Sequence, residues 1–279
     1  FMFVELVGGL LSNSLALLAD AGHMLTDSSA IGLALLAIWV ASRPASARRT
    51  FGFQRTEILA SFLNALSLWL IAGWIFYEAA GRFREPQEAH GAVTLGVGAV
   101  GLVVNVVAAW VLKRPAEDNL NVEGAFLHVL GDLLGSLAVV IGGILVIALD
   151  WHVADPIFGV LIGVLILFSS GRLLWKAVHV LLEGTPSRLD IQSLCQRLEQ
   201  VDGVANVHDI HAWSITIGYE VLSVHVTKDD AEPTSPGHLL QHLREIASGE
   251  FNISHVTIQL EDAKDGCEEA HHIAHGLGG

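Results

Sequence analysis

Cysteines, basic residues and charged residues of any kind are scarce in this sequence. Its 279 residues include only two cysteines, Cys195 and Cys267, which are too few for a disulfide framework and do not indicate an oxidising compartment. Charged residues make up 16% of the chain and hydrophobic residues 52%, which excludes intrinsic disorder and is too apolar for an ordinary soluble protein. The net charge of −14 argues against nucleic acid as a partner.

Two catalytic signatures are also absent from the sequence. There is no glycine-rich loop that would cradle phosphates and no ATP site, so any transport would have to draw on an ion gradient. The His-Glu-x-x-His pattern of zinc metalloproteases is missing as well. We therefore do not expect an enzyme.

The two parts of the chain on either side of Glu183 differ chemically. The 182 residues before it hold 10 basic and 13 acidic side chains among long apolar stretches, whereas the 97 residues from Glu183 onward hold 5 basic and 16 acidic ones. Nine of the 14 histidines also lie in this second part. The pattern predicts a transmembrane domain over residues 1–182, an acidic, histidine-rich soluble domain over 183–262, and a polar flexible tail over 263–279.

Six apolar stretches in the first part predict a bundle of transmembrane helices, because about 20 apolar residues cross the roughly 30 Å of hydrocarbon in a bilayer. So many apolar stretches would leave too little polar surface to coat a soluble globule. The first stretch has only eleven residues before Ser12 and the chain begins with Phe1, so we expect this helix to be truncated at its N-terminus. The expected helices cover residues 1–11, 14–41, 56–80, 92–112, 119–149 and 154–182.

Basic residues in the short loops indicate the orientation, because lysine and arginine gather on the cytoplasmic side. The loops after the second and fourth helices carry six of them, against two in the loop after the third. Both ends of the six-helix unit, and with them the soluble domain, are therefore expected in the cytoplasm of a multi-pass protein of the cell (inner) membrane. The six basic residues after the second and fourth helices are Arg43, Arg48, Arg49, Arg55, Lys113 and Arg114. The two after the third helix are Arg82 and Arg84.

The soluble part has the pattern helix, strand, strand, helix, strand. Helical spacing of apolar residues predicts helices over 190–201 and 236–248. Runs rich in β-branched residues predict strands over 204–215, 219–227 and 253–260, with a hairpin near Gly218. The expected fold is thus a membrane α-helical bundle followed by an α+β domain in the order αββαβ.

The second and fifth apolar stretches share one chemical pattern, His-x-x-x-Asp. It occurs as His23 with Asp27 and as His128 with Asp132, and residues four apart lie on one face of an α-helix. Each histidine lies nine residues into its helix, which at roughly 1.5 Å per residue places it about 14 Å deep. Ionisable groups at that depth are costly and normally mark a pathway or a buried site.

Because the two helices are expected to run in opposite directions, His23 would lie level with Asp132, and Asp27 level with His128. Two nitrogens and two oxygens then converge, a ligand set that tetrahedral Zn²⁺ accepts. The two carboxylates would also balance the charge of the ion in a low-dielectric medium. A structural hydrogen bond between helices, which the second copy of the pattern disfavours, and a proton relay without metal remain alternatives.

Three other polar side chains, Asp20, Asn64 and Asn105, lie in the expected membrane helices. Asp20 precedes His23 by three residues, and we expect it to line an entrance or to cap its helix. Asn64 and Asn105 are each expected to form a hydrogen bond to a neighbouring helix.

Five segments of the sequence together resemble one known family. They are SLALLADAGHMLTD at 14–27, FGFQRTE at 51–57, HVLGD at 128–132, HDIHAW at 208–213 and HVTIQL at 255–260. The chain is similar over nearly its whole length to the cation diffusion facilitator family, in its zinc-transporter branch. The paired His-x-x-x-Asp is the most specific part of the resemblance.

The resemblance implies a homodimeric antiporter that exports zinc from the cytoplasm in exchange for protons. It also implies six transmembrane helices, a cytoplasmic ferredoxin-like domain, and a transport site formed by the two His-Asp pairs. In that branch, the histidine at position 23 is associated with a preference for zinc over cadmium. Relatives have a salt bridge between the third helix and the end of the sixth, to which Arg55 and Glu183 correspond.

Relatives also bind further zinc ions in the cytoplasmic domain near the dimer interface, in a structural or regulatory role. The matching residues are His208, His225, His238, His255 and Glu261. Strand alternation would place His208 on the face opposite His211. Four residues of the tail could either catch metal or only keep the tail soluble; they are Cys267, His271, His272 and His275.

The sequence departs from some relatives in two loops. The loop containing Arg48-Arg49-Thr50-Phe51-Gly52-Phe53 offers no metal ligands, so no metal site is expected there. The segment 113–123 contains no histidine, unlike the histidine-rich loop of some family members.

Three functional hypotheses follow. The first is secondary active transport by alternating access around the His₂Asp₂ site, where zinc and protons compete for the same groups. The second is a membrane-anchored zinc sensor or buffer without transport, and the third is a zinc channel without proton exchange. The first is favoured because the ligands in the membrane are complete without the soluble domain.

Overall fold

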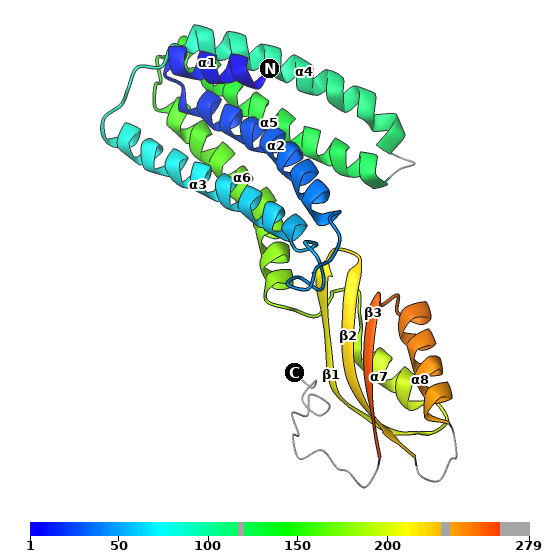
Figure 1. Ribbon diagram of the computed structural model, residues 1–279. Helices are drawn as coiled ribbons and strands as arrows, with labels where there is room; N and C mark the ends of the chain where they lie inside the picture. The colour runs from blue at the N-terminus through cyan, green and yellow to red at the C-terminus, as the bar shows by residue number, and fades with distance from the viewer. Residues whose placement is uncertain (117–119, 230–234, 263–279) are drawn as a thin grey trace. The chain divides into compact units, whose positions relative to one another are not determined.

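The computed structural model describes residues 1–116, 120–229 and 235–262 and divides into two compact units (Figure 1). The first unit comprises Phe1–Leu36 and Ala60–Trp175. The second comprises Ala37–Leu59 and the chain from Lys176 onward. The helices of the membrane part are α1 (Met2–Ser12), α2 (Leu15–Ala41), α3 (Thr56–Arg84), α4 (Gly91–Ala116), α5 (Leu120–Leu149) and α6 (Ala154–Leu181).

Five of these helices, α2 to α6, are long and apolar enough to cross a membrane, and α1 is a shorter apolar helix of 11 residues. The expected helical bundle is therefore confirmed. The third helix continues beyond the expected end at residue 80, so that Arg82 and Arg84 lie in its last turn and not in a loop. Arg82 forms ion pairs there: its Nε lies 3.1 Å from Glu78 Oε1, and its Nη1 lies 3.4 Å from Oδ2 of Asp155 in α6.

Aliphatic side chains from four helices form the core of the membrane unit. Leu17 of α2, Ile75 of α3, Val139 of α5 and Ile166 of α6 are almost completely buried in one cluster. Without a hydrophobic driving force between helices in lipid, such close packing and small residues hold the bundle together.

Glycines bring α4 and α5 close together. A Cβ added at Gly91 would lie 3.1 Å from the carbonyl oxygen of Gly143, and one at Gly98 would lie 2.7 Å from a methyl group of Val139. Larger side chains at these positions would push the helices apart. This packing helps to position α5, which carries one half of the His-Asp pattern.

The second unit contains the cytoplasmic fold in the expected order αββαβ. Its elements are α7 (Ile191–Glu199), β1 (Val204–Thr216), β2 (Tyr219–Lys228), α8 (Pro236–Glu245), a π-helical turn η1 (Ile246–Glu250) and β3 (His255–Glu261). The sheet has the order β1-β2-β3, with β1 and β2 antiparallel and β2 and β3 parallel. The turn Ile217–Gly218 joins the hairpin, and Gly218 has a φ of 83°, which favours glycine at the second central position of a turn.

Both helices of this domain pack against the same face of the sheet (Figure 1). Leu222, Val224 and Val226 of β2 are fully or almost fully buried against α7 and α8. Because side chains alternate along a strand, His225 points to the other face. His208 of β1 is its cross-strand partner, so these two histidines meet on the face that α7 and α8 leave open.

Candidate metal centre

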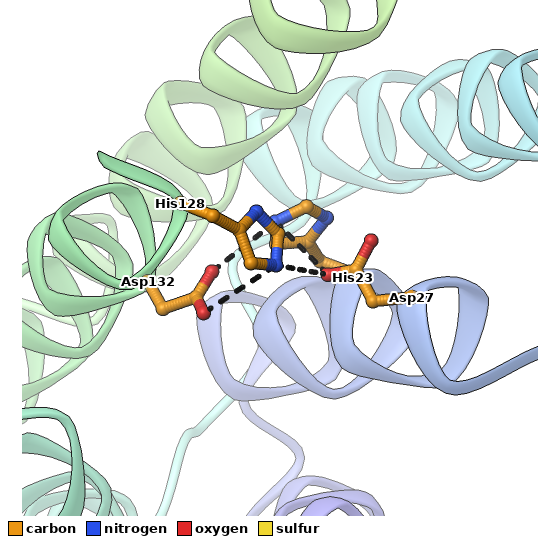
Figure 2. A group of neighbouring side chains, drawn as sticks. All are labelled: His23, Asp27, His128 and Asp132. Atoms are coloured by element: carbon orange, nitrogen blue, oxygen red, sulfur yellow. Dashed lines mark ion pairs between the residues drawn. The ribbon is translucent and has the colours of Figure 1, made fainter. Parts of the chain in front are cut away.

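Four side chains from two membrane helices converge, as the spacing of the sequence predicts. His23 and Asp27 reach from α2 toward His128 and Asp132 of α5 (Figure 2). His23 Nε2 lies 3.4 Å from Asp132 Oδ1, and His128 Nε2 lies 3.3 Å from Asp27 Oδ2. Within α2, His23 Nε2 lies 3.5 Å from Asp27 Oδ2, and within α5, His128 Nε2 lies 3.8 Å from Asp132 Oδ2. The cross-helix pairs are those expected for antiparallel helices.

These distances match a tetrahedral metal site. Zinc bonds to histidine nitrogen and carboxylate oxygen are about 2.0–2.2 Å long, so adjacent ligand atoms of a tetrahedron lie roughly 3.4 Å apart. The four nitrogen-to-oxygen distances of 3.3 to 3.8 Å, which involve both oxygens of Asp132, lie near that value, and one ligand atom from each residue lies within 4.8 Å of the others. Two neutral imidazoles and two carboxylates would neutralise a divalent ion. The group could therefore bind one such ion with little rearrangement.

Part of the group is shielded and lacks conventional partners. The side chains of His23 and Asp132 are each 16% exposed, whereas that of His128 is 50% exposed. His23 Nδ1 and Asp132 Oδ1 are buried, and no described residue forms a hydrogen bond with either atom. Buried polar atoms without partners are costly, and a bound cation would satisfy the carboxylate oxygen. The more exposed His128 leaves one side of the group accessible.

A polar network continues from this group between α2, α4 and α5. Asp20 is almost fully buried, so it neither caps α2 nor lies at an exposed entrance. Ser136 donates to Asp20 Oδ2 at 3.4 Å, and Asn105 donates to Ser136 at 2.9 Å, which confirms the hydrogen bond expected between helices. Gly135 leaves room for Asp20, because a Cβ there would lie 2.9 Å from Asp20 Oδ1.

Glu5 is a buried acid that the sequence analysis did not single out. It is 1% exposed in α1, and its Oε2 has no hydrogen-bond partner in the described part of the chain. A Cβ at Gly101 of α4 would lie 3.0 Å from its Oε1. The signal available in the sequence was a single acid in an apolar stretch.

A second group of possible ligands lies on the open face of the cytoplasmic sheet. His208 Nε2 is 3.1 Å from Glu261 Oε2, and His225 Nδ1 is 2.8 Å from Glu261 Oε1. The two imidazole rings meet edge to face with centroids 5.5 Å apart. All three side chains are 20% exposed or less. Neighbouring strands β1, β2 and β3 thus contribute one residue each.

Asp209 is a neighbour of this group that the sequence analysis missed as a ligand candidate. The β1–β2 register shifts between His208 and His211, and Asp209 has a φ of 47° at this bulge. Its carboxylate lies 3.6 Å from His225 Nε2 and 3.0 Å from His211 Nε2. A bulge re-aims a side chain relative to strand alternation, so the regular pattern could not place it.

The structure does not bring the other expected cytoplasmic residues into this group. His238 is an exposed residue in the first turn of α8. His255 is exposed at the start of β3, where its ring packs edge to face against Phe51 at 5.6 Å. Cys267, His271, His272 and His275 lie outside the described residues. Arg55 and Glu183 form an ion pair, with Nη2 2.9 Å from Oε1.

Comparison with protein families identifies the family to which both domains belong. Residues 1–182 match the family described as "Cation efflux transmembrane domain" and residues 186–263 match "Cation efflux protein, cytoplasmic domain". The chain belongs to the cation efflux family. The resemblance to the cation diffusion facilitators is thereby confirmed, and this member of the family is a multi-pass membrane protein with a cytoplasmic C-terminal domain.

Characterised relatives are transporters of metal ions. "Zinc transporter ZitB" of Escherichia coli is 43% identical over 263 residues, which cover 94% of this chain and 83% of the relative. The "Cadmium, cobalt and zinc/H(+)-K(+) antiporter" of Bacillus subtilis is 40% identical over 263 residues, covering 94% and 85%. "Metal cation efflux system protein CzcD" of Cupriavidus metallidurans is 40% identical over 275 residues, covering 99% and 86%.

Proposed function

We propose that this protein exports zinc from the cytoplasm in exchange for protons, through the site formed by His23, Asp27, His128 and Asp132. The observation that carries the proposal is the convergence of these four side chains from two membrane helices, with ligand atoms within 4.8 Å of one another. The names of the relatives, which include zinc transporters and a zinc/H(+)-K(+) antiporter, support metal efflux.

Proton exchange would follow from the chemistry of the ligands. Zinc binds neutral imidazole and ionised carboxylate, so a bound ion and bound protons exclude each other at the same atoms. An ordinary imidazole has a pKa of about 6.5, so protonation in a more acidic compartment would favour release of the ion. The site would then return to the cytoplasmic side with protons bound in place of the metal. Cobalt and cadmium, named for one relative, are further candidate cargoes.

The cytoplasmic group would hold a resident zinc ion. His208, His225 and Glu261 lie on adjacent strands with ligand atoms within 4.8 Å of one another, and two nitrogens with one carboxylate fit zinc. Among the described residues, no hydrogen-bond partner reaches the buried Nδ1 of His208, which leaves its Nε2 facing Glu261 as the nitrogen that would bind the metal. We propose that residues 1–182 transport the zinc ion, and that residues 183–262 bind regulatory zinc and form a homodimer. His238 and His255 would bind zinc outside the group of His208, His225 and Glu261.

Vesicles test the transport site. We expect zinc uptake into vesicles loaded with a zinc-sensitive dye to accelerate when their interior is acidic. Removal of partners that only orient a ligand already costs about 10–100-fold in metal affinity, so Asp27→Asn and Asp132→Asn should each reduce uptake more than about tenfold. The matched control is Asp202→Asn, which changes an exposed carboxylate of the cytoplasmic domain. Unchanged transport in either site variant would refute the proposal.

The cytoplasmic group also supports a second candidate, a zinc sensor or buffer without transport. It predicts that His208→Ala with His225→Ala removes the zinc response, while His128→Ala has no effect. Transport predicts that His128→Ala abolishes zinc flux and that the cytoplasmic variants retain it in part. His242→Ala, an exposed histidine of α8, is the control for the histidine substitutions.

A further inference from the structure

The segment between α2 and α3 is strongly basic in an otherwise acidic protein. Residues 42–55 contain Arg43, Arg48, Arg49 and Arg55 and no acidic residue, whereas the whole chain has a net charge of −14. This segment lies between the cytoplasmic ends of two membrane-spanning helices.

Backbone bonds and aromatic contacts give this segment a defined shape. Ser46 and Arg49 exchange two backbone hydrogen bonds of 3.0 and 2.9 Å. Gly52 then takes a φ of 68°, and its N–H donates to the Arg49 carbonyl at 2.9 Å. The guanidinium of Arg49 lies 4.2 Å from the centroid of the Phe53 ring. The arginines are therefore presented from a folded turn and not from a loose loop.

The turn forms one wall of a cavity of about 560 Å³, which we call the arginine pocket. The lining residues used here are Arg48, Arg49, Phe51, Arg55, Leu181 and Trp213. Its other walls include the first turn of α3 and the last turn of α6. Since both helices cross the bilayer, the pocket lies at its cytoplasmic surface.

The charge of the pocket is only partly neutralised. Arg55 is paired with Glu183 at 2.9 Å. Within the described part of the chain, no carboxylate lies within ion-pair distance of Arg48 or Arg49. Two guanidinium groups thus remain for an external anion. Guanidinium groups bind phosphate oxygens in pairs, which gives such a site geometric as well as electrostatic preference.

Apolar residues beside the pocket favour a lipid over a soluble anion. Phe51 in its wall is 40% exposed, Leu182 is 77% exposed, and Ile217 at the tip of the β1–β2 hairpin is 86% exposed. Thr216 donates to Glu57 at 2.8 Å, which holds that tip against the first turn of α3. Exposed apolar side chains next to basic ones are typical of a surface that contacts a membrane interface.

We propose that the arginine pocket binds the phosphate of an anionic phospholipid from the cytoplasmic leaflet. Arg48 and Arg49 contact the phosphate, while Phe51 and the neighbouring apolar residues contact the glycerol and the first carbons of the acyl chains. The same turn touches the cytoplasmic domain through the Arg55–Glu183 pair and the Phe51–His255 contact. A bound lipid therefore steadies the junction between that domain and the ends of α3 and α6.

Native mass spectrometry of the full-length protein in detergent tests this site. The protein is titrated with phosphatidylglycerol or phosphatidylcholine, and the affinity for the first bound lipid is measured. Each basic residue at an anionic lipid surface is worth about fivefold in affinity. We expect Arg48→Gln with Arg49→Gln to lower the affinity for phosphatidylglycerol at least tenfold and to leave the weak binding of phosphatidylcholine unchanged.

Two further variants make the result decisive. Lys113→Gln with Arg114→Gln removes the same charge from exposed positions at the cytoplasmic end of α4 and should change the affinity less than twofold. Arg48→Lys with Arg49→Lys keeps the charge and should bind better than the glutamine pair, which a misfolded protein would not do. Equal losses in both glutamine pairs, or no loss in either, would overturn the proposal. Displacement of the lipid by millimolar inorganic phosphate would instead assign the pocket to a soluble anion.

Discussion

The carboxylate of Asp155, in the first turn of α6, caps the start of α2 by accepting the backbone N–H of Leu15 at 2.6 Å. It also accepts the Ser14 hydroxyl at 2.5 Å and is approached by Arg82 at 3.4 Å. A helix N-terminus carries unpaired N–H groups and partial positive charge, which an acid stabilises. Here the cap comes from a residue 140 positions away. It anchors the helix that carries His23 and Asp27.

Asp155→Asn should therefore destabilise the membrane unit. Hydrogen bonds to a charged group contribute about 1.5–3 kcal/mol each, and the amide can replace only part of them, so we expect a loss of about 2 kcal/mol in the free energy of unfolding. Denaturation in detergent micelles measures it. Asp150→Asn, whose carboxylate is 94% exposed, is the matched control. Equal stability of the two variants would show that the cap contributes little.

Zinc binding at the membrane site should depend steeply on pH. Metal binding requires both imidazoles to be neutral, so once the solution is more acidic than the pKa of an imidazole, its protonation costs roughly tenfold in zinc affinity per pH unit. We expect the zinc affinity of the protein carrying His208→Ala and His225→Ala, which leaves the membrane group intact, to fall between pH 7.5 and pH 5.5. Calorimetric titration measures it. A constant affinity across this range would argue against histidine ligands.

Arg188→Ala should destabilise the cytoplasmic domain. Arg188 pairs with Glu220, which is 3% exposed, and donates to the carbonyl groups of Phe251 and Asn252 at 3.2 and 2.9 Å. Removing Arg188 leaves a buried carboxylate without its counter-ion. Because Arg188 itself is partly exposed, we expect a moderate loss of about 2 kcal/mol in the free energy of unfolding. Hydrogen exchange of the β2 amides reports the loss. Arg197→Ala removes an arginine from the exposed pair with Glu250 and should have little effect.

Cys195 should react slowly with alkylating agents. Burial, together with the charge of Glu199, raises the pKa of its thiol. Only the thiolate is nucleophilic, so a raised pKa means that less of Cys195 is thiolate at pH 8 than in a free cysteine. The rate of alkylation should therefore still increase with pH above pH 9. Iodoacetamide labelling of the Cys267→Ser protein, followed by mass spectrometry, measures this profile. A plateau near pH 8.5 would contradict it.

Much of the architecture was predictable because it depends on local patterns. Apolar stretches of span length identified α2 to α6, and alternation with β-branched residues identified the three strands. The convergence of His23 with Asp132 was predictable for a similar reason: each pair lies on one helix face, and the connectivity makes the two helices antiparallel.

Contacts distant in sequence were not predictable in this way. The pairing of Arg82 with Asp155 extends α3 beyond its apolar pattern. The bulge at Asp209 turns a side chain toward His225, against the regular alternation of β1. Burial of Glu5 depends on the close approach of α4 at Gly101, which no periodicity reports.

By itself, the sequence determined the membrane helices, the αββαβ order and the ligand types of the metal centre, because hydrophobicity and chemical identity are properties of each residue and its near neighbours. Only the tertiary structure decided which histidines of the cytoplasmic domain meet. It grouped His208 and His225 with Glu261, left His238 and His255 outside that group, and folded the basic turn around the arginine pocket. Such choices depend on strand register, bulges and helix packing, which arise only when segments far apart in the chain come into contact.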